Sequence, residues 1–241
     1  MKKPKMILFD YGETLFHEKP FDALAGNRAL LARSNSNPRN ITAEEIQVLA
    51  DAMNRDIGRG GHLSPIQPVT EIPNRSFNRF LYEYLGISFD LTPLVMEQVF
   101  FDAASGGATE EGIDLLLSWL WEQNIRTGVI SNISFSEATL RRRIESFLPE
   151  HHFEFIMASS EYVFRKPSHW LFELALRKAD LQAEDVWYCG DNFSCDVEGA
   201  TGVGITPVWY QRIPDAQQTR TYNGISVSNW QELRVLLESL N

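Results

Sequence analysis

Reactive side chains follow short apolar runs at three separate points of this chain. Asp10 comes directly after MILF, Ser131 ends the run RTGVIS, and Asp191 follows VWYCG. A short apolar run is typical of a buried strand in a parallel sheet, and open α/β sheets bind ligands at the carboxyl ends of such strands. We therefore expect these three side chains to converge on one edge of a sheet.

Three further residues could complete a reactive site at this edge. Thr14 lies four positions after Asp10. Lys166 stands in the tripeptide RKP, and Asp196 lies five positions after Asp191. Carboxylates supply the oxygen ligands that a divalent cation such as Mg²⁺ prefers. Taken singly, each residue is more typical of a turn, a helix cap or a solvated surface, but their shared position beside predicted strand ends favours a site.

The order of these motifs resembles that of the haloacid dehalogenase superfamily. An Asp, then a Ser, then a Lys, then a Gly-Asp pair with a second Asp follow one another between Asp10 and Asp196. Most members of that superfamily are magnesium-dependent phosphatases. The resemblance therefore implies a hydrolase that uses Mg²⁺ and cleaves a phosphoric monoester, or an acyl phosphate, of a small metabolite.

The resemblance also implies a role for each residue. Asp10 matches the nucleophile that forms an aspartyl-phosphate, and Lys166 matches the cation that neutralises it and binds the transferring group. Ser131 and the adjacent Asn132 would bind the phosphate, and the hydroxyl of Thr14 would support the loop around the nucleophile. The metal ligands implied are Asp10, the main-chain carbonyl of Gly12, Asp191 and Asp196.

One position departs from the superfamily pattern. The first motif is usually Asp-x-Asp-Gly-Thr, whereas residues 10–14 read DYGET, so Gly12 stands where the second Asp normally acts as general acid and base. Loss of such a group typically costs about 10²–10⁴ in rate. Either the leaving group needs little protonation, or Glu13, His17 or His62 replaces the acid, or the protein is a weak catalyst that binds a phosphate-bearing ligand or partner.

Two branches of the superfamily also lack that second Asp. Phosphonatases form a Schiff base with a lysine of the cap, but this chain has no lysine between Lys19 and Lys166. Dehalogenases need no metal and lack the Gly-Asp pair, which is present here at Gly190 and Asp191. Both comparisons favour metal-assisted phosphoryl transfer.

Strand and helix signals alternate from residue 109 onward, which predicts a parallel sheet with helices on both faces. The predicted strands are residues 6–10, 126–131, 153–158, 185–190 and 205–209. Ser136 and Ser168 would cap two of the helices between them, and Trp230 opens a closing helix. We thus expect an α/β fold, a doubly wound parallel sheet, formed by residues 1–17 and 106–241.

Residues 18–105 carry helical signals only, and we predict that they form a helical cap domain inserted after the first strand. Thr42 with Glu45 makes a capping box, and Thr92-Pro93 opens another helix. The apolar stripe of a third predicted helix is Phe77, Phe80, Leu81 and Tyr84. The cap would determine specificity, and its loop at residues 59–62, RGGH, is more typical of a solvated loop than of an anion site.

Composition limits the partners and the compartment. The 241 residues include 22 Lys and Arg against 32 Asp and Glu, so the net charge of −10 argues against nucleic acid or an anionic membrane surface. The basic amino terminus is followed by too short an apolar run for a signal peptide or membrane span. Two cysteines, Cys189 and Cys195, fit a reduced cytoplasmic protein. We expect a monomer or homodimer.

Overall fold

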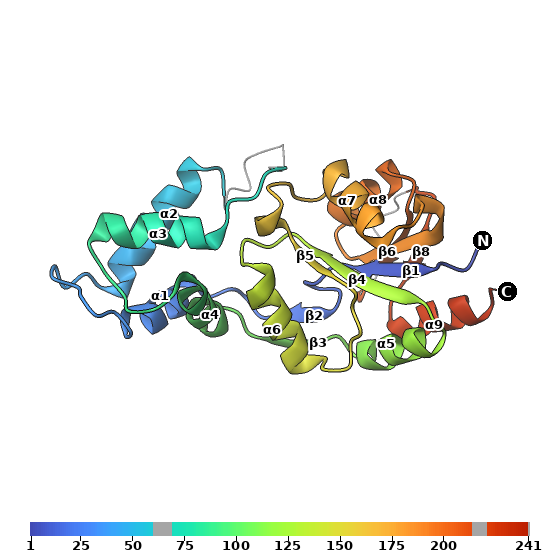
Figure 1. Cartoon of the computed structure of the whole chain (residues 1–241), viewed down its shortest axis with the longest axis horizontal. Helices are drawn as coiled ribbons and strands as arrows, with labels where there is room; N and C mark the ends of the chain where they lie inside the picture. The colour runs from blue at the N-terminus through green and yellow to red at the C-terminus, as the bar shows by residue number, and fades with distance from the viewer. Residues whose placement is uncertain (60–68, 214–220, 241) are drawn as a thin grey trace.

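A six-stranded parallel sheet forms the centre of the molecule (Figure 1). The computed structural model describes residues 1–59, 69–213 and 221–240. Across the sheet the strands follow in the order β5 (Ile156–Ala158), β4 (Arg126–Ser131), β1 (Met6–Phe9), β6 (Val186–Gly190), β7 (Thr206–Tyr210) and β8 (Ile225–Val227). The chain thus winds outward from β1 in both directions, which confirms the doubly wound α/β fold.

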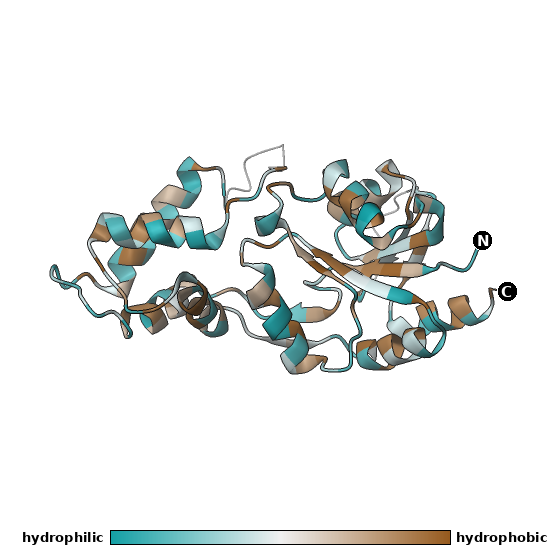
Figure 2. Cartoon of the chain, viewed as in Figure 1, coloured by the Kyte–Doolittle hydropathy of each residue, from teal (hydrophilic) through white to brown (hydrophobic). Residues whose placement is uncertain are grey.

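Helices cover both faces of this sheet, because its strands are apolar on both sides (Figure 2). Ile7 and Phe9 of β1 pack toward one helical layer, whereas Met6 and Leu8 pack toward the other. The first layer consists of α5 (Ile113–Glu122), α6 (Glu137–Phe147) and α9 (Trp230–Glu238), and the second of α7 (His169–Ala179) and α8 (Gly199–Gly202).

The predicted strands agree with the structure to within one residue, except at residues 153–158. There the pairing with β4 begins only at Ile156, opposite Val129, so that strand is half as long as predicted. The structure adds β8, which we did not predict because three residues are too few for a periodic signal. Ser136 accepts a hydrogen bond from the amide of Thr139 and caps α6 as predicted.

Between β1 and α5 the described residues form four helices, which make a separate layered group (Figure 1). They are α1 (Ala23–Leu31), α2 (Ala43–Asp56), α3 (Asn74–Leu85) and α4 (Pro93–Ala104). The capping box of Thr42 and Glu45 is present at the start of α2. The four helices share an apolar cluster, which Phe135 of the sheet domain also joins. The inserted helical cap is therefore packed against the sheet domain.

The predicted apolar stripe of α3 is wrong for two of its members. Phe80 and Tyr84 are 57% and 65% exposed, and their rings stack on each other at 5.9 Å outside the cluster. Leu81 is buried as predicted, but the residues beside it in the cluster are Tyr82 and Leu85. The buried face of helix α3, which packs toward α1 and α4, is therefore rotated about the helix axis from the face that we predicted.

Two short antiparallel strands connect the cap to the sheet domain. Strand β2 (Phe16–Glu18) pairs with β3 (Gly107–Thr109), with His17 opposite Ala108. A side chain at Gly107 would place its Cβ 2.4 Å from the carbonyl oxygen of His17, so the pairing requires glycine there. The predicted domain boundaries at 17/18 and 105/106 fall in and beside this two-stranded hinge, and the division itself stays a prediction.

Two buried glutamates also hold the cap against the sheet domain. Glu97 of α4 accepts hydrogen bonds from Ser136 and from the hydroxyl of Thr139, the latter at 2.7 Å. The side chain of Glu71, which is fully buried, pairs with Arg165 at 3.0 Å and accepts from Ser159 at 2.8 Å. Charged groups buried in this way are stable only when paired, so these contacts fix the cap over one edge of the sheet.

Candidate active site

Three carboxylates meet at the carboxyl edge of the sheet, as the motifs predicted. Asp10 follows β1, and Asp191 follows the adjacent strand β6, so the pairing of Phe9 with Cys189 brings them side by side. Asp196 lies in a π-helical turn, Phe193–Glu198, that begins two residues after Asp191. One carboxylate oxygen from each of the three residues lies within 4.8 Å of the other two.

Lys166 lies buried among these carboxylates, with 1% of its surface exposed. Its Nζ contacts Asp10 Oδ1 at 2.8 Å and Asp196 Oδ1 at 2.7 Å. Its remaining proton is donated to the hydroxyl of Tyr188 at 2.7 Å. Burial by itself lowers the pKa of Lys166, but the charges and hydrogen bonds of Asp10 and Asp196 outweigh it and raise the pKa above its ordinary value. The lysine is therefore a fixed positive charge.

Two residues position Lys166. Asn132 holds its main chain from both sides, since its Oδ1 accepts from the Lys166 amide at 2.7 Å and its Nδ2 donates to the Lys166 carbonyl at 2.9 Å. The hydroxyl of Tyr188 donates a hydrogen bond to the carbonyl of Ile130 at 3.0 Å, which leaves its oxygen free to accept from the ammonium group of Lys166. We did not predict this role for Tyr188, because it stands inside a buried strand.

Gly190 allows the close approach of Asp196 to the end of β6. A Cβ at this position would lie 2.3 Å from Cγ of Asp196, far inside van der Waals contact. Asp196 is held there because its Oδ2 accepts from the amide of Asn192 at 2.9 Å. The glycine of the Gly-Asp pair is thus required by packing against the second acid.

Gly190→Ala is expected to displace Asp196 and destabilise the fold by about 1–3 kcal/mol, the usual cost of overpacking. The matched control is Gly202→Ala in α8, where a Cβ would meet no atom within 4 Å and should change stability by less than about 1 kcal/mol. Urea denaturation of both variants measures the difference. Equal stability of the two variants would contradict the packing requirement.

The site carries more negative than positive charge, which suits a divalent cation. Burial, together with the charges of Asp10 and Asp196, raises the pKa of Asp191 to about 7 against the opposing charge of Lys166. Burial likewise raises the pKa of Asp196, again opposed by Lys166. The mutual repulsion of carboxylates clustered in this way is reduced when they bind a divalent cation that prefers oxygen ligands. The three carboxylates therefore fit Mg²⁺, and the carbonyl of Gly12 as a further ligand stays a prediction.

The other predicted site residues lie at the same edge or beneath it. Ser131 ends β4, next to β1, and is buried. Thr14 is completely buried, and its hydroxyl has no hydrogen-bond partner among the described residues. No hydrogen bond among the described residues therefore supports the predicted role of the Thr14 hydroxyl in holding the loop around Asp10. Phosphate binding by Ser131, Asn132 and Lys166 stays a prediction.

Of the three residues considered as replacement acids, Glu13 and His17 bind each other and are not members of the carboxylate cluster. Glu13 adopts a left-handed backbone with φ +52°, and its carboxylate binds His17 at 2.9 Å and Arg212 at 3.6 Å. His17 is exposed. His62 lies outside the described residues, as does most of the RGGH loop.

Glu18, which the sequence analysis missed, lies close to Gly12. Its Oε2 would be 3.3 Å from a Cβ at Gly12, and its Oε1 accepts from the hydroxyl of Ser105 at 3.4 Å. Burial raises the pKa of Glu18 above its ordinary value. The hydrogen bond from Ser105 opposes this rise, as does the charge of Arg143, while the carboxylates Glu13 and Asp10 add to it.

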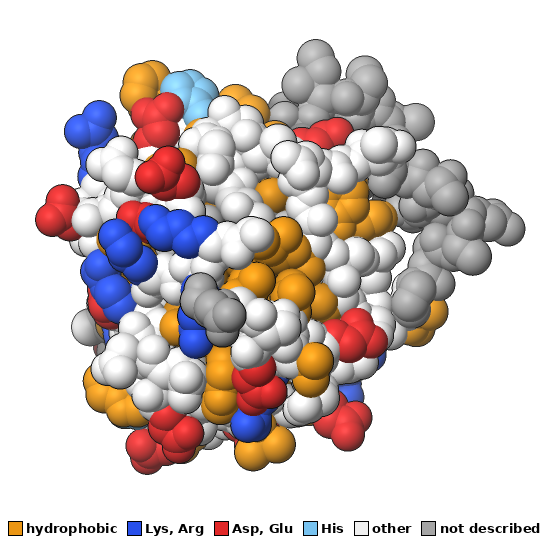
Figure 3. Space-filling view, turned by 90° about the vertical axis from the view of Figure 1, so that its right-hand side faces the viewer, with side chains coloured by type: hydrophobic (Ala, Val, Ile, Leu, Met, Phe, Trp, Pro, Cys, Tyr) orange, Lys and Arg blue, Asp and Glu red, His pale blue; other side chains and the backbone are white. Residues whose placement is uncertain are grey.

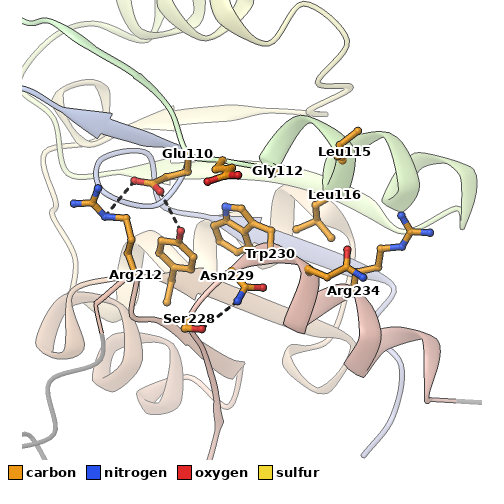
Figure 4. Close-up of a pocket in the computed structure, with 12 residues that line it drawn as sticks. Glu110, Gly112, Leu115, Leu116, Arg212, Ser228, Asn229, Trp230 and Arg234 are labelled. Atoms are coloured by element: carbon orange, nitrogen blue, oxygen red, sulfur yellow. Dashed lines mark hydrogen bonds and ion pairs between the residues drawn. The ribbon is translucent and has the colours of Figure 1, made fainter.

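Hollows lined by described residues open near this edge. One of about 260 Å³ opens beside Asp191 and is also lined by Glu13, Trp209 and Arg212. Another, of about 510 Å³, contains none of the clustered carboxylates (Figure 4). On its wall Glu110 accepts from the hydroxyl of Tyr210 at 3.1 Å and faces Arg212. The first hollow is therefore the one that reaches the reactive groups.

Other surfaces give fewer indications of a ligand. The end of the sheet domain remote from the cap shows charged side chains of both signs, with hydrophobic ones between them (Figure 3). Among residues 1–59, 69–213 and 221–240, no helix is both long and apolar enough to cross a bilayer. No disulfide joins Cys189 and Cys195, whose thiols are both buried.

Comparisons with known sequences point to the same family as the motifs. Residues 97–210 match the family model of haloacid dehalogenase-like hydrolases. The chain is 27% identical over 121 residues to haloacid dehalogenase-like hydrolase domain-containing protein 3 of Mus musculus, covering 48% of this chain and 45% of that protein. It is 29% identical over 124 residues to glyceraldehyde 3-phosphate phosphatase of Pyrococcus furiosus, covering 50% of each. The chain matches about half the length of these relatives.

Comparison with solved structures covers almost the whole chain. A 2-haloacid dehalogenase from Pseudomonas syringae aligns with a TM-score of 0.68 at 20% identity, over 99% of both chains. A haloacid dehalogenase-type phosphatase from Thermococcus onnurineus aligns with a TM-score of 0.57 at 18% identity, over 100% of this chain and 99% of that one. At such identities the likeness shows the fold alone. The family is indicated by the sequence, since residues 97–210 match the haloacid dehalogenase-like hydrolases and the motifs follow in the order typical of that superfamily.

Proposed function

We propose that this protein is a magnesium-dependent phosphatase that hydrolyses a small phosphorylated metabolite through an aspartyl-phosphate on Asp10. The observation that carries the proposal is the gathering of Asp10, Asp191 and Asp196 around the buried ammonium of Lys166. A lone carboxylate repels a phosphate, but one held beside a lysine and a divalent cation can attack phosphorus. The phosphatase names among the sequence relatives support the same reaction class.

The residues of the site would divide the reaction as follows. Asp10 attacks phosphorus, and Lys166, already bonded to its Oδ1, would neutralise charge on the carboxylate and on the transferring group. Ser131 and Asn132 would orient the phosphate at the end of β4. Mg²⁺, held by the carboxylates of Asp10, Asp191 and Asp196, would offset the repulsion between nucleophile and phosphate. The cap, fixed by Glu71 and Glu97, would limit the access of water.

A catalytically weak protein that binds a phosphate-bearing ligand or partner is the alternative function. The observation that favours it is Gly12, which has no side chain where the superfamily pattern places the general acid and base. Such a protein would keep the cation site and the phosphate contacts but turn over slowly, because loss of that acid costs about 10²–10⁴ in rate.

A panel of alkyl, aryl and acyl phosphates and pyrophosphate, with glyceraldehyde 3-phosphate among the alkyl esters, tests the two functions. We expect release of inorganic phosphate in the presence of Mg²⁺, loss of the reaction with EDTA, and recovery when Mg²⁺ is added in excess. Phosphate binding, measured by calorimetry, without release from any substrate would support the alternative. Release that is indifferent to EDTA would contradict the proposed mechanism.

A further inference from the structure

The carboxyl group of Glu18 occupies the space that a side chain at position 12 would enter. The nearest atom to a Cβ built on Gly12 is Glu18 Oε2, at 3.3 Å, and the next is Glu18 Cδ, at 3.9 Å. Glu18 comes from β2 in the hinge, six residues farther along the chain. The missing carboxylate of the first motif is thus replaced in space by a carboxylate from another segment.

The backbone around Glu18 directs this carboxyl toward the site. In β2, Phe16 is buried and His17 is exposed, and Glu18 again turns inward to half-burial. The pairing of β2 with β3 holds the strand, and the amide of Glu18 donates to Glu13 Oε1 at 3.0 Å. Glu13 is therefore engaged in orienting the strand that carries Glu18.

The other carboxylates close to Asp10 have different partners. Asp196 is bonded to Lys166 and to the amide of Asn192. Asp191 faces Asp10 and Asp196, the other two members of the carboxylate cluster. Glu18 is not a member of this cluster, and its side-chain hydrogen-bond partner among the described residues, the hydroxyl of Ser105, is neutral. It is thus placed beside Gly12, two residues after the nucleophile, without belonging to the carboxylate cluster.

We propose that Glu18 is the general acid and base of this protein, in place of the side chain that Gly12 lacks. This inference rests on the proposed phosphatase function. As an oxygen of Asp10 bonds to phosphorus, the bond from phosphorus to the leaving oxygen breaks and Glu18 gives that oxygen its proton. Glu18 then takes a proton from the water that attacks phosphorus, which breaks the bond to Asp10 and releases phosphate.

The first test compares Glu18→Gln with the wild type on a matched pair of substrates, an alkyl phosphate and p-nitrophenyl phosphate. The amide keeps the shape of the side chain and can still accept the hydrogen bond from Ser105, but it cannot donate an acidic proton. We expect kcat on the alkyl ester to fall by about 10²–10⁴, and kcat on the aryl ester, whose leaving group is acidic, to fall much less. Equal losses on both esters would show a structural role and overturn the proposal.

Glu13→Gln is the matched comparison, because it removes the neighbouring carboxylate that accepts from the amide of Glu18. We expect a smaller effect that is alike for the two esters, since Glu13 is held by His17, Arg212 and the amide of Glu18. A selective loss on the alkyl ester in Glu13→Gln, with none in Glu18→Gln, would assign the acid to Glu13 instead.

The second test moves the acid from position 18 to position 12. Glu18→Ala vacates the space, and the backbone of Gly12 lies outside the left-handed region, so an Asp can be introduced there. We expect Gly12→Asp in the Glu18→Ala background to recover at least about tenfold of the lost alkyl-ester turnover. Gly12→Ala in the same background fills the space without an acid and should recover nothing. Equal recovery in both would overturn the proposal.

The failure of this inference is distinguishable from failure of the proposed function. A wild-type protein that releases no phosphate from any ester with Mg²⁺ contradicts both. A wild type with turnover that needs Mg²⁺ and Asp10, but with alkyl-ester turnover unaffected by Glu18→Gln, contradicts the role of Glu18 alone. Circular dichroism of each variant confirms that the comparison is made between folded proteins.

Discussion

Asp10→Asn is expected to reduce phosphate release by roughly 10⁴-fold or more, because it removes the nucleophile on which the whole reaction depends. The side chain keeps its volume, and Lys166 keeps its contacts with Asp196 and Tyr188. The variant should therefore stay folded. Phosphate release measured over long incubations, together with thermal unfolding, checks both parts of the expectation.

Asp102→Asn is the matched control, since Asp102 is half-exposed near the end of α4 and pairs with Arg142 at the surface. It should keep full activity, as exposed ion pairs contribute little. Substantial turnover by Asp10→Asn would mean that another group attacks phosphorus. An unfolded Asp10→Asn variant would instead assign Asp10 a structural role.

Lys166→Met is expected to give the largest loss of stability. It leaves Asp10 and the 1%-exposed Asp196 side by side without their shared cation, and breaking a buried ion pair from one side costs about 3–5 kcal/mol. Urea denaturation in the absence of divalent cations measures this loss. Lys178→Met, at an exposed position of α7, is the control and should change stability by about 0.5 kcal/mol or less.

The cost of Lys166→Met should also grow as the pH rises. In the wild type the raised pKa of Lys166 keeps its charge, and the stability it contributes, throughout neutral pH. Without the lysine, burial raises the pKa of Asp196 further, so at low pH the carboxyl is protonated and neutral in the folded protein. The destabilisation should thus be smaller at pH 5 than at pH 8. A loss that is independent of pH would show that lost packing, rather than lost charge, is responsible.

Much of the sheet and the order of the motifs could be read from the sequence. β1, β4 and β6 are buried on both faces, so each appears as an unbroken apolar run. The helix beginning at Thr42 was equally clear, because a capping box is a local pattern of four residues. Asp10 and Asp191 follow directly from these elements, since parallel strands place their carboxyl ends at one edge.

The contacts of Glu18 and Tyr188 in the site could be recognised only in the tertiary structure. Strands β2 and β3 are three residues each and pair across about ninety residues of chain, so neither carries a periodic signal of its own. Glu18 lies near Gly12 because of that pairing. Tyr188 reaches Lys166 because β6 lies beside β1, although its position in the sequence is that of an ordinary core residue.

The same distinction explains the errors in the cap and at the sheet edge. In α3 the spacing of apolar residues allowed more than one buried face, and packing against α1 and α4 selected the one with Leu81, Tyr82 and Leu85. β8 exists because it can pair with β7. The sequence by itself determined which segments fold into buried strands and capped helices, since those signals are local. Which side chains meet was decided by the tertiary structure, because it depends on contacts between residues far apart in the chain.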